Sequence, residues 1–205
     1  MDNFNLSSLD CIQKWFNDIS EYVKKQNNKG YFDAAKKCED LFCDLLNTVY
    51  GWDLDNLNYT KNNSPIIDLG DYEHSVCVQV TSCQDKSKKV KIEKAIRNFK
   101  EKNMEQDYKH IIVFMIDWAG YQDVGLTENE QFEVSFWCLR DMMSFIESAT
   151  EQKQKRCVDI IQAYFMDGLL LDVKREINDK TFFAEKTILD GKFQTYFAYG
   201  LGVCA

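Results

Sequence analysis

The stretch of sequence that decides the fold runs from residue 62 to residue 82 and reads NNSPIIDLGDYEHSVCVQVTS. Residues 65–69 and 76–81 are rich in β-branched and apolar side chains, which favour strands. Gly70-Asp71 between them is a turn signal. A loosely alternating segment at 52–59 precedes both. The sequence therefore predicts a meander of three short strands.

Helices are predicted on both sides of this meander. Apolar residues spaced by three and four indicate an amphipathic helix over 8–27. A second helix opens at Asp33, a good N-cap, and stops at Gly51, and we expect the two to pack as an antiparallel pair. Residues 86–102 read as a helix and 110–116 as a buried central strand. The order is that of an αβββαβ core in an α/β fold.

The rest of the chain is mainly helical, and we expect it to pack on the core. We divide the chain into a core domain at 1–140 and a helical extension at 141–205. The elements predicted after residue 116 are a strand at 132–137, helices at 139–148 and from 155 to about 178, and a terminal β-hairpin with its turn at Asp190-Gly191.

Composition excludes several classes of protein. A formal charge of -8 over 205 residues argues against a chain that coats nucleic acid or anionic membrane nonspecifically. Eight cysteines occur without any CxxC pair, and the N-terminus lacks a signal peptide pattern, so we expect reduced, mostly buried thiols. No apolar run approaches the roughly 18 residues that span a bilayer. We expect a soluble, cytoplasmic protein.

The three-strand segment also carries the residues that predict chemistry. Asp68 ends one strand, and Gln79 and Thr81 share one face of the next. Phosphodiester cleavage uses a divalent cation, and Mg²⁺ prefers one or two carboxylates together with water and phosphate. Asp68 would anchor Mg²⁺ or Mn²⁺, with Gln79 and Glu39 as further ligands. The alternatives are a turn-capping Asp68 with a polar strand face, and a solvated helix carboxylate at Glu39.

This arrangement resembles the PD-(D/E)xK nucleases, also called restriction-endonuclease-like nucleases. Residues 65–69, P-I-I-D-L, and residues 79–81, Q-V-T, occupy the two halves of the motif. The resemblance implies a catalytic role for Asp68 and Gln79. It also implies a lysine at position 81, where Thr81 cannot supply a positive charge. Lys88 and Lys89 on the following helix are candidate substitutes.

That helix is strongly basic. Residues 86–102 hold eight bases and two acids, a local charge of +6 in an acidic chain. Such a patch fits contacts with a phosphate backbone, which are sensitive to salt and blind to sequence. A solvated helix face is the equal alternative. The residues that we expect to bind nucleic acid are Lys86, Lys91, Lys94 and Arg97.

A longer run of motifs resembles the bacterial SMEK domain family. It comprises DAAKKCEDLFCDLLNTVYGWDLDNLN at 33–58, NNSPIIDLGD at 62–71 and VQVTS at 78–82, within a similarity that covers roughly residues 8–140. The resemblance implies a role in bacterial conflict and antiphage systems, beside ATPase, nucleotide-binding or effector modules. The family shares the glutamine and the threonine of this motif.

Two functions therefore stand at the level of sequence. The first is a Mg²⁺- or Mn²⁺-dependent nuclease of an antiphage system. The second is a nuclease-fold sensor or adaptor that binds nucleic acid or a partner defence protein without cleaving. Thr81 favours the second, and Lys88 and Lys89 favour the first. A homodimer would be a common route to cutting both strands of a duplex.

Overall fold

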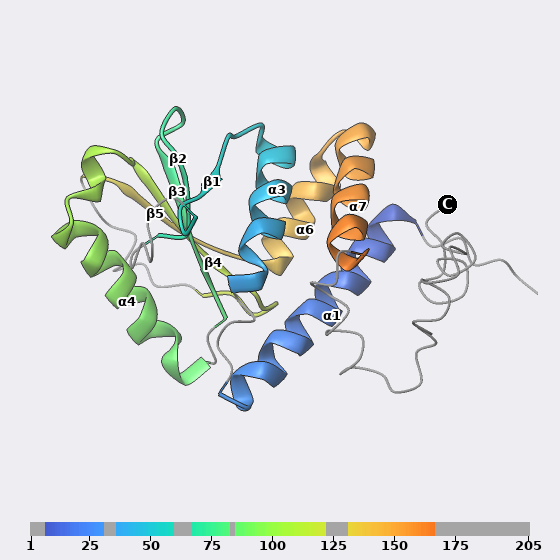
Figure 1. The fold of residues 1–205 in the computed structure, drawn as a ribbon, viewed down its shortest axis with the longest axis horizontal. Coiled ribbons are helices and arrows are strands. Elements are labelled where there is room, and N and C mark those ends of the chain that lie inside the picture. The colour runs from blue at the N-terminus through green and yellow to red at the C-terminus, as the bar shows by residue number, and fades with distance from the viewer. Residues whose placement is uncertain (1–6, 31–35, 60–66, 83–84, 122–130, 167–205) are drawn as a thin grey trace, which may run out of the picture.

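A mixed five-stranded sheet organises the protein (Figure 1). The computed structural model describes residues 7–30, 36–59, 67–82, 85–121 and 131–166. The first three strands are antiparallel, and the last two run parallel to the third, in the order of the sequence. The strands are β1 (Asp55–Asn56), β2 (Leu69–Asp71), β3 (Val76–Thr81), β4 (His110–Met115) and β5 (Glu133–Cys138).

Helices cover both faces of the sheet. Four helices lie together on one face, and a fifth lies alone on the other, at the left of Figure 1. The group of four comprises α1 (Ser8–Asn28), α3 (Glu39–Tyr50), α6 (Leu139–Ser148) and α7 (Glu151–Met166), the single helix is α4 (Asp85–Glu101), and the short 3-10 helix η1 (Met104–Gln106) follows it. The described chain is therefore an α/β fold with an open mixed sheet.

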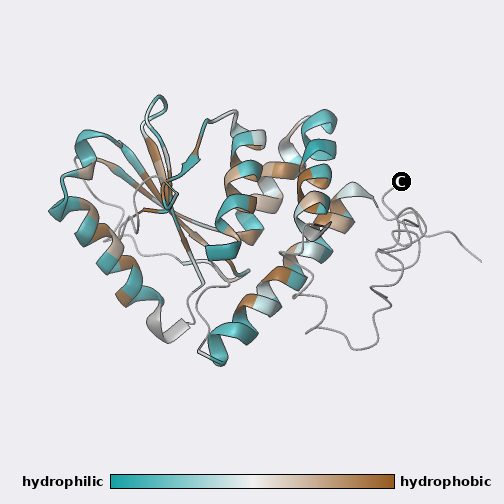
Figure 2. Cartoon of the chain, viewed as in Figure 1, coloured by the Kyte–Doolittle hydropathy of each residue, from teal (hydrophilic) through white to brown (hydrophobic). Residues whose placement is uncertain are grey.

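The two faces of β3 differ in chemistry. Its valines at positions 76, 78 and 80 belong to the larger core beneath the four helices, whereas Cys77 belongs to the smaller core beneath α4. Side chains alternate along a strand, so Gln79 and Thr81 share the α4 face with Cys77. Figure 2 shows the apolar strands between helices whose outer faces are hydrophilic. The expected common face of Gln79 and Thr81 agrees with this register.

Local signals explain most of the helix ends. Ser7 accepts a hydrogen bond from the Asp10 amide while the Asp10 carboxylate accepts one from the Ser7 amide, which is a capping box at the start of α1. Gly51 ends α3 with a φ of 74°, in the left-handed region that favours glycine. Helix α7 packs against both α1 and α3. The two N-terminal helices were expected to pack on each other, but each packs mainly on α7, and the rings of Phe16 and Phe42 form a contact between them.

The predicted turn at Gly70-Asp71 is wrong. Both residues lie in β2, and the turn follows at residues 72–75. The buried Asp71 carboxylate accepts hydrogen bonds from the backbone amides of Asp53 and His74, so it caps the turn from the end of the strand. Gly70 is needed for packing, because a Cβ there would lie 2.5 Å from the Tyr108 hydroxyl oxygen.

Other predicted ends of helices and strands differ from the observed ones or lie outside the described residues. The strand expected at 52–59 contains only the two residues of β1, and β2 begins after Asp68 rather than before it. The predicted N-cap Asp33, the strand start at Pro65 and everything after residue 166, including the predicted terminal hairpin, lie outside the described residues. Helix α7 begins at Glu151, earlier than expected.

Five described cysteines match the expectation of reduced, buried thiols, whereas Cys11 is buried but disulfide-bonded and departs from it. Cys38, Cys43, Cys77, Cys138 and Cys157 are buried and free. Burial raises the pKa of the Cys38 thiol to about 12. Within the described part of the chain, no helix has the length and apolar character to cross a membrane.

Candidate functional site

The site is centred on Asp68, at the point where β2 separates from β3. The Asp68 amide donates to the carbonyl of Val78 at 3.0 Å, while its own carbonyl accepts from the Leu57 amide at 2.8 Å. Its carboxylate accepts from the Val80 amide at 2.8 Å. Asp68 therefore links the edge of the sheet to β3 through both backbone and side chain. Its side chain is buried, with 8% of the residue exposed.

Two side-chain amides also point at the Asp68 carboxylate. Gln79 donates from Nε2 to Oδ2 and contacts the Val80 carbonyl at 3.3 Å. Asn58 donates from Nδ2 to Oδ1 at 3.3 Å and to the Glu39 carboxylate at 2.8 Å. Asn58 therefore bridges the two carboxylates, so Glu39, Asp68 and Gln79, all predicted from sequence, belong to one hydrogen-bonded cluster.

Glu39 lies in the first turn of α3 and is only 5% exposed. Burial raises its pKa to about 7, and the neighbouring charge of Asp68 adds to the rise. Burial also raises the pKa of Asp68, although its hydrogen bonds from Val80, Asn58 and Gln79 oppose the change. Two adjacent buried carboxylates favour ionisation only when positive charge is close. The pair is therefore chemically suited to a cation.

Three polar groups around this pair were not predicted from the sequence. The Asn56 amide donates to Glu39 at 3.4 Å and to Asp40 at 2.7 Å, and Asn58 forms the bridge described above. The positive charge of Lys36 lowers the pKa of both Glu39 and Asp68, against the larger effect of burial. The i, i+2 spacing of the two asparagines in D-N-L-N was the available signal.

Gln79 and Thr81 also line a cavity of about 310 Å³ between β3 and α4. The helix contributes Lys91, Lys94 and Asn98 to its lining. Two predicted nucleic-acid-binding lysines thus share one cavity with two predicted catalytic residues. Gln79 belongs to both the cavity and the carboxylate cluster.

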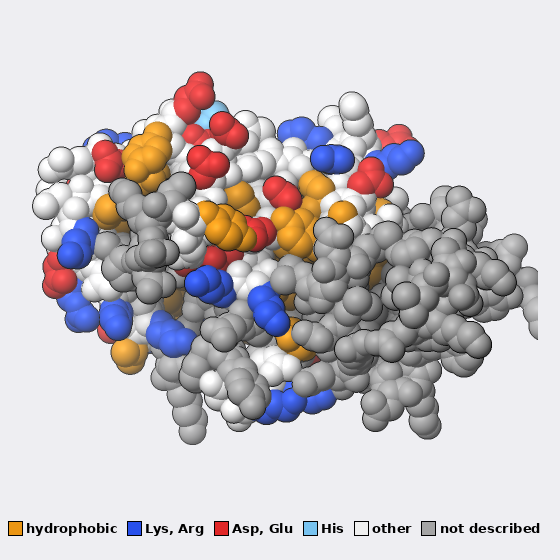
Figure 3. All heavy atoms as spheres, in the orientation of Figure 1, with side chains coloured by type: hydrophobic (Ala, Val, Ile, Leu, Met, Phe, Trp, Pro, Cys, Tyr) orange, Lys and Arg blue, Asp and Glu red, His pale blue; other side chains and the backbone are white. Residues whose placement is uncertain are grey.

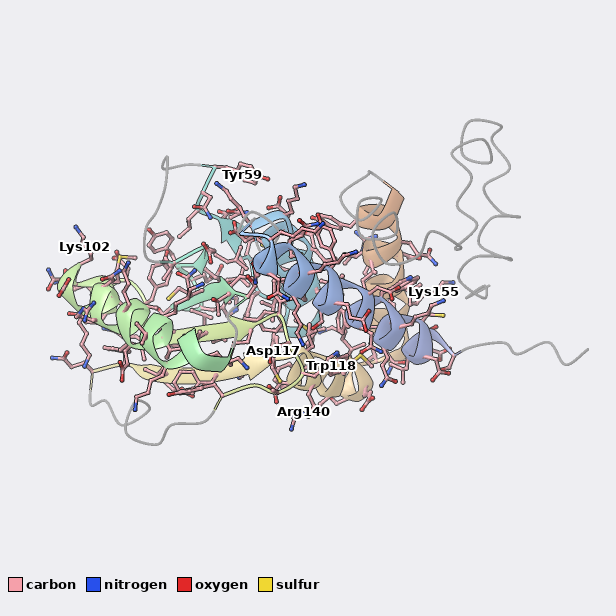
Figure 4. The ribbon with its side chains drawn as sticks, turned by 90° about the horizontal axis from the view of Figure 1, so that it is seen from below. Tyr59, Lys102, Asp117, Trp118, Arg140 and Lys155 are labelled. Atoms are coloured by element: carbon pink, nitrogen blue, oxygen red, sulfur yellow. The ribbon has the colours of Figure 1, made fainter. Side chains whose placement is uncertain are left out.

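The two lysines predicted to replace the motif lysine have other partners. Lys88 is 5% exposed, and its Nζ lies 2.8 Å from the Asp117 carboxylate and donates to the Gly120 carbonyl at 3.3 Å. Lys89 is exposed, with its Nζ 3.8 Å from Glu93. In Figure 4, Asp117 lies well apart from Tyr59, the residue after Asn58. Lys88 thus ties α4 to the loop after β4.

The remaining basic residues of α4 whose side chains are described lie along its exposed side. Arg97 is exposed with its Nε 3.9 Å from Glu101, and Lys100 lies over the Phe132 ring. Figure 3 shows lysine and arginine side chains following this helix on the face in view. Only the backbone of Lys86 is described. The predicted basic face is present along the helix, and its role in binding stays a prediction.

Neither histidine forms a catalytic relay within the described residues. His74 contacts the turn-capping carboxylate of Asp71 at 2.7 Å. His110 Nε2 lies 2.8 Å from the Ser135 hydroxyl and 3.7 Å from the Glu133 carboxylate. Because hydroxyl and carboxylate approach the same nitrogen, the imidazole does not stand between them, as a relay requires.

A divalent cation fits the carboxylate cluster chemically. No group of three or more His, Cys, Asp and Glu side chains with metal-binding potential occurs in the described ranges, so any cation here rests on two carboxylates and amide oxygens. Glu39 and Asp68 supply the hard oxygen ligands that Mg²⁺ prefers. The Gln79 amide presents nitrogen to Asp68, and a half-turn of that amide would present its oxygen instead.

Fold and site together define an α/β protein with a buried carboxylate pair at the edge of a mixed sheet. A family model for the SMEK domain matches residues 11–161, and the chain belongs to this family. The match extends beyond residue 140 through α6 and into α7. Comparison with curated proteins and with solved structures gave no match.

Proposed function

We propose that this protein is a metal-dependent nuclease of the PD-(D/E)xK type. The observation that carries the proposal is the single hydrogen-bonded cluster of Glu39, Asp68 and Gln79. These residues come from α3, from the position just before β2 and from β3, in the same order as the acidic and glutamine positions of that class. The order of α3, three antiparallel strands, α4 and a parallel β4 supports a restriction-endonuclease-like core.

In this proposal Asp68 and Glu39 hold Mg²⁺ or Mn²⁺, with Gln79 as a third ligand after its amide turns. When bound, such an ion activates a water and neutralises charge on the phosphate. Lys36 adds positive charge beside the carboxylates, and its effect on their pKa values supports this role. Lys91 and Lys94 would hold the phosphate backbone in the adjoining cavity.

The test is cleavage of plasmid DNA, linear DNA and RNA in the presence of Mg²⁺ or Mn²⁺. We expect cleavage by the natural protein, loss on chelation and loss of at least 100-fold in the isosteric Asp68→Asn variant. Asp55→Asn, at an exposed position of β1, is the charge-matched control and should retain activity. Equal cleavage by Asp68→Asn and the natural protein would remove the proposed site.

A second candidate is a nuclease-fold sensor or adaptor that binds without cleaving. The observation that favours it is the absence of a lysine at Thr81 together with the engagement of Lys88 by Asp117. Retained, salt-dependent binding of nucleic acid with no metal-dependent cleavage would select this function. Binding that does not respond to salt would exclude phosphate contacts in either function.

The biological setting is also a proposal. The SMEK resemblance supports a bacterial antiphage or conflict system in the cytoplasm, with a partner defence protein acting beside this chain. A homodimer would place two sites on the two strands of a duplex. Light scattering of the purified protein tests the dimer, and cleavage of one strand only would accompany a monomer.

A further inference from the structure

The cavity between α4 and β3 narrows the class of nucleic acid that the proposed site would bind. We infer that this cavity binds one nucleotide unit of a single nucleic-acid strand and holds its phosphate between Lys91 and Lys94. This inference rests on the proposed function, because it concerns the strand that reaches the neighbouring carboxylates. It adds that an intact duplex is not the preferred form.

The lining has the chemistry that a nucleotide requires. Lys91, Lys94 and Asn98 follow one another at spacings of three and four, so they lie along one side of α4. Both lysines are exposed residues of the helix and line the cavity, so they place positive charge beside it. Asn98 and Thr81 supply neutral donors and acceptors. The cavity is thus cationic at the helix and neutral at the strand.

Apolar groups complete the other walls. Ile92 and Ala95 from the helix and Val113 from β4 line the same cavity. An apolar wall beside two cations suits the sugar and base of a nucleotide next to its phosphate. Ligand pockets of roughly 300 Å³ are at the small end of the usual range. This cavity, at about 310 Å³, therefore takes one nucleotide rather than a base pair.

The cavity shares one wall with the carboxylates. Gln79 lines the cavity and also donates to Asp68. A nucleotide held there places its phosphodiester link beside the Glu39 and Asp68 pair. Because a base within a duplex must leave its stack to enter such a space, a strand that is already single has the lower cost of binding. Single-stranded nucleic acid is therefore the expected substrate class.

The competing explanation is a general attraction between α4 and any polyanion. In that case every exposed lysine and arginine along the helix would contribute equally to binding, including Lys102, which follows the last residue of α4 and is labelled in Figure 4. If the cavity is the binding site, Lys91 and Lys94 contribute more to binding than the other lysines and arginines of the helix. Substitutions that remove equal charge inside and outside the cavity separate the two explanations.

The first experiment measures binding of a labelled single-stranded oligonucleotide by fluorescence anisotropy, with EDTA present so that no cleavage occurs. We expect the Lys91→Gln/Lys94→Gln double variant to bind at least 20-fold more weakly. The matched control, Lys100→Gln/Lys102→Gln, removes the same charge at exposed positions outside the cavity and should lose less than 4-fold. Equal losses in both double variants would overturn the inference. Asn98→Asp, which adds one negative charge to the cavity without removing a lysine, should also weaken binding.

The second experiment compares substrates with the natural protein. A single strand should bind at least 10-fold more tightly than a blunt duplex of the same length, and a free nucleoside monophosphate should compete at millimolar concentration. Duplex binding as tight as single-strand binding would overturn the inference. Metal-dependent cleavage that requires Asp68 but prefers duplex would keep the proposed nuclease and remove only this inference. Single-strand binding without cleavage would keep this inference and remove the proposed nuclease activity.

Discussion

At the scale of the residue, the Glu39 and Asp68 pair is the unusual feature of this chain. Each carboxylate is buried, and their hydrogen-bond donors are neutral amides rather than arginine or lysine. Neutral donors stabilise a carboxylate less than charged ones do. Such a pair costs folding free energy at neutral pH, and its retention is understandable if it serves a cation.

This cost gives a prediction for the Glu39→Gln variant. The pKa of Glu39 is about 7 in the folded protein and 4.5 in its ordinary state. The folded protein binds the Glu39 proton more tightly than the unfolded chain does. This stabilises the fold at pH values below the unfolded pKa of 4.5, and the contribution is lost as pH rises through the folded pKa of about 7. We expect the variant to be more stable than the natural protein at pH 8, by about 1–3 kcal/mol, and to lose that advantage near pH 5.

Urea unfolding at the two pH values, in EDTA, measures the difference. Glu101→Gln, at an exposed position of α4, is the matched control, and its stability should stay within about 0.5 kcal/mol of the natural protein at both pH values. A stability difference for Glu39→Gln that does not change with pH would show that burial does not raise the pKa of this carboxylate in the folded protein.

Local patterns were enough to nominate Glu39, Asp68 and Gln79, because helix periodicity, strand alternation and motif spacing are properties of short segments, although the turn between the strands was misplaced. They were not enough for Lys36, Asn56 or Asn58. The roles of Asn56 and Asn58 depend on how the segment after α3 folds back over the start of β2, and that of Lys36 depends on how the residues before α3 lie near Asp68. That path is set by packing between distant segments, which no local pattern contains.

At the scale of the element, α4 joins a basic exposed side to a buried anchor. The anchor is the ion pair of Lys88 with Asp117, whose side chains are 6% and 25% exposed. The helix was predicted nearly to its last residue, since its apolar stripe is regular. Its lysines could not be sorted from sequence, because Lys88 heads the same stripe that faces the sheet.

The anchor predicts a loss of stability in Lys88→Met. Removing one partner leaves the Asp117 carboxylate partly buried without its cation, which we expect to cost about 2 kcal/mol after allowance for its exposure. The double variant Lys88→Met/Asp117→Asn should recover most of the loss. Lys89→Met, at an exposed position, should leave stability within about 0.5 kcal/mol of the natural protein.

Denaturant unfolding of the natural protein, Lys88→Met, the single variant Asp117→Asn and the double variant forms a double-mutant cycle for this pair. Cleavage assays on the same proteins test the predicted catalytic role of Lys88. A large loss of activity in Lys88→Met with unchanged stability would mean that the lysine acts in catalysis and not as the anchor of α4.

At the scale of the whole molecule, the helices after residue 140 share the core of the residues before it. Leu139, Met142 and Ile146 of α6 and Cys157 and Ile161 of α7 are buried with residues of α1 and α3. The sequence-based division at residue 140 placed a boundary where helical composition begins, and composition does not show which helices share a core. The shared core predicts a single cooperative unfolding unit.

Ile161→Ala tests this unit. The side chain is fully buried, so its truncation should cost about 2–4 kcal/mol. All four tryptophans lie before residue 140, so their fluorescence reports mainly on the predicted core domain, with Trp137 also packed against Phe145 of α6. We expect their unfolding transition to shift together with the helical signal in circular dichroism. Asp159→Ala, exposed on α7, is the control, and an unshifted tryptophan transition in Ile161→Ala would indicate a separate domain.

The central claim is that Glu39 and Asp68 hold a divalent cation, and calorimetric titration with Mn²⁺ at pH 7 tests it most directly. Because Glu39 has a pKa of about 7, binding should release about half a proton per ion, seen as a dependence of the heat on the buffer. We predict one ion per chain, with binding lost in Asp68→Asn and proton release lost in Glu39→Gln. Unchanged binding and unchanged proton release in both variants would contradict the account.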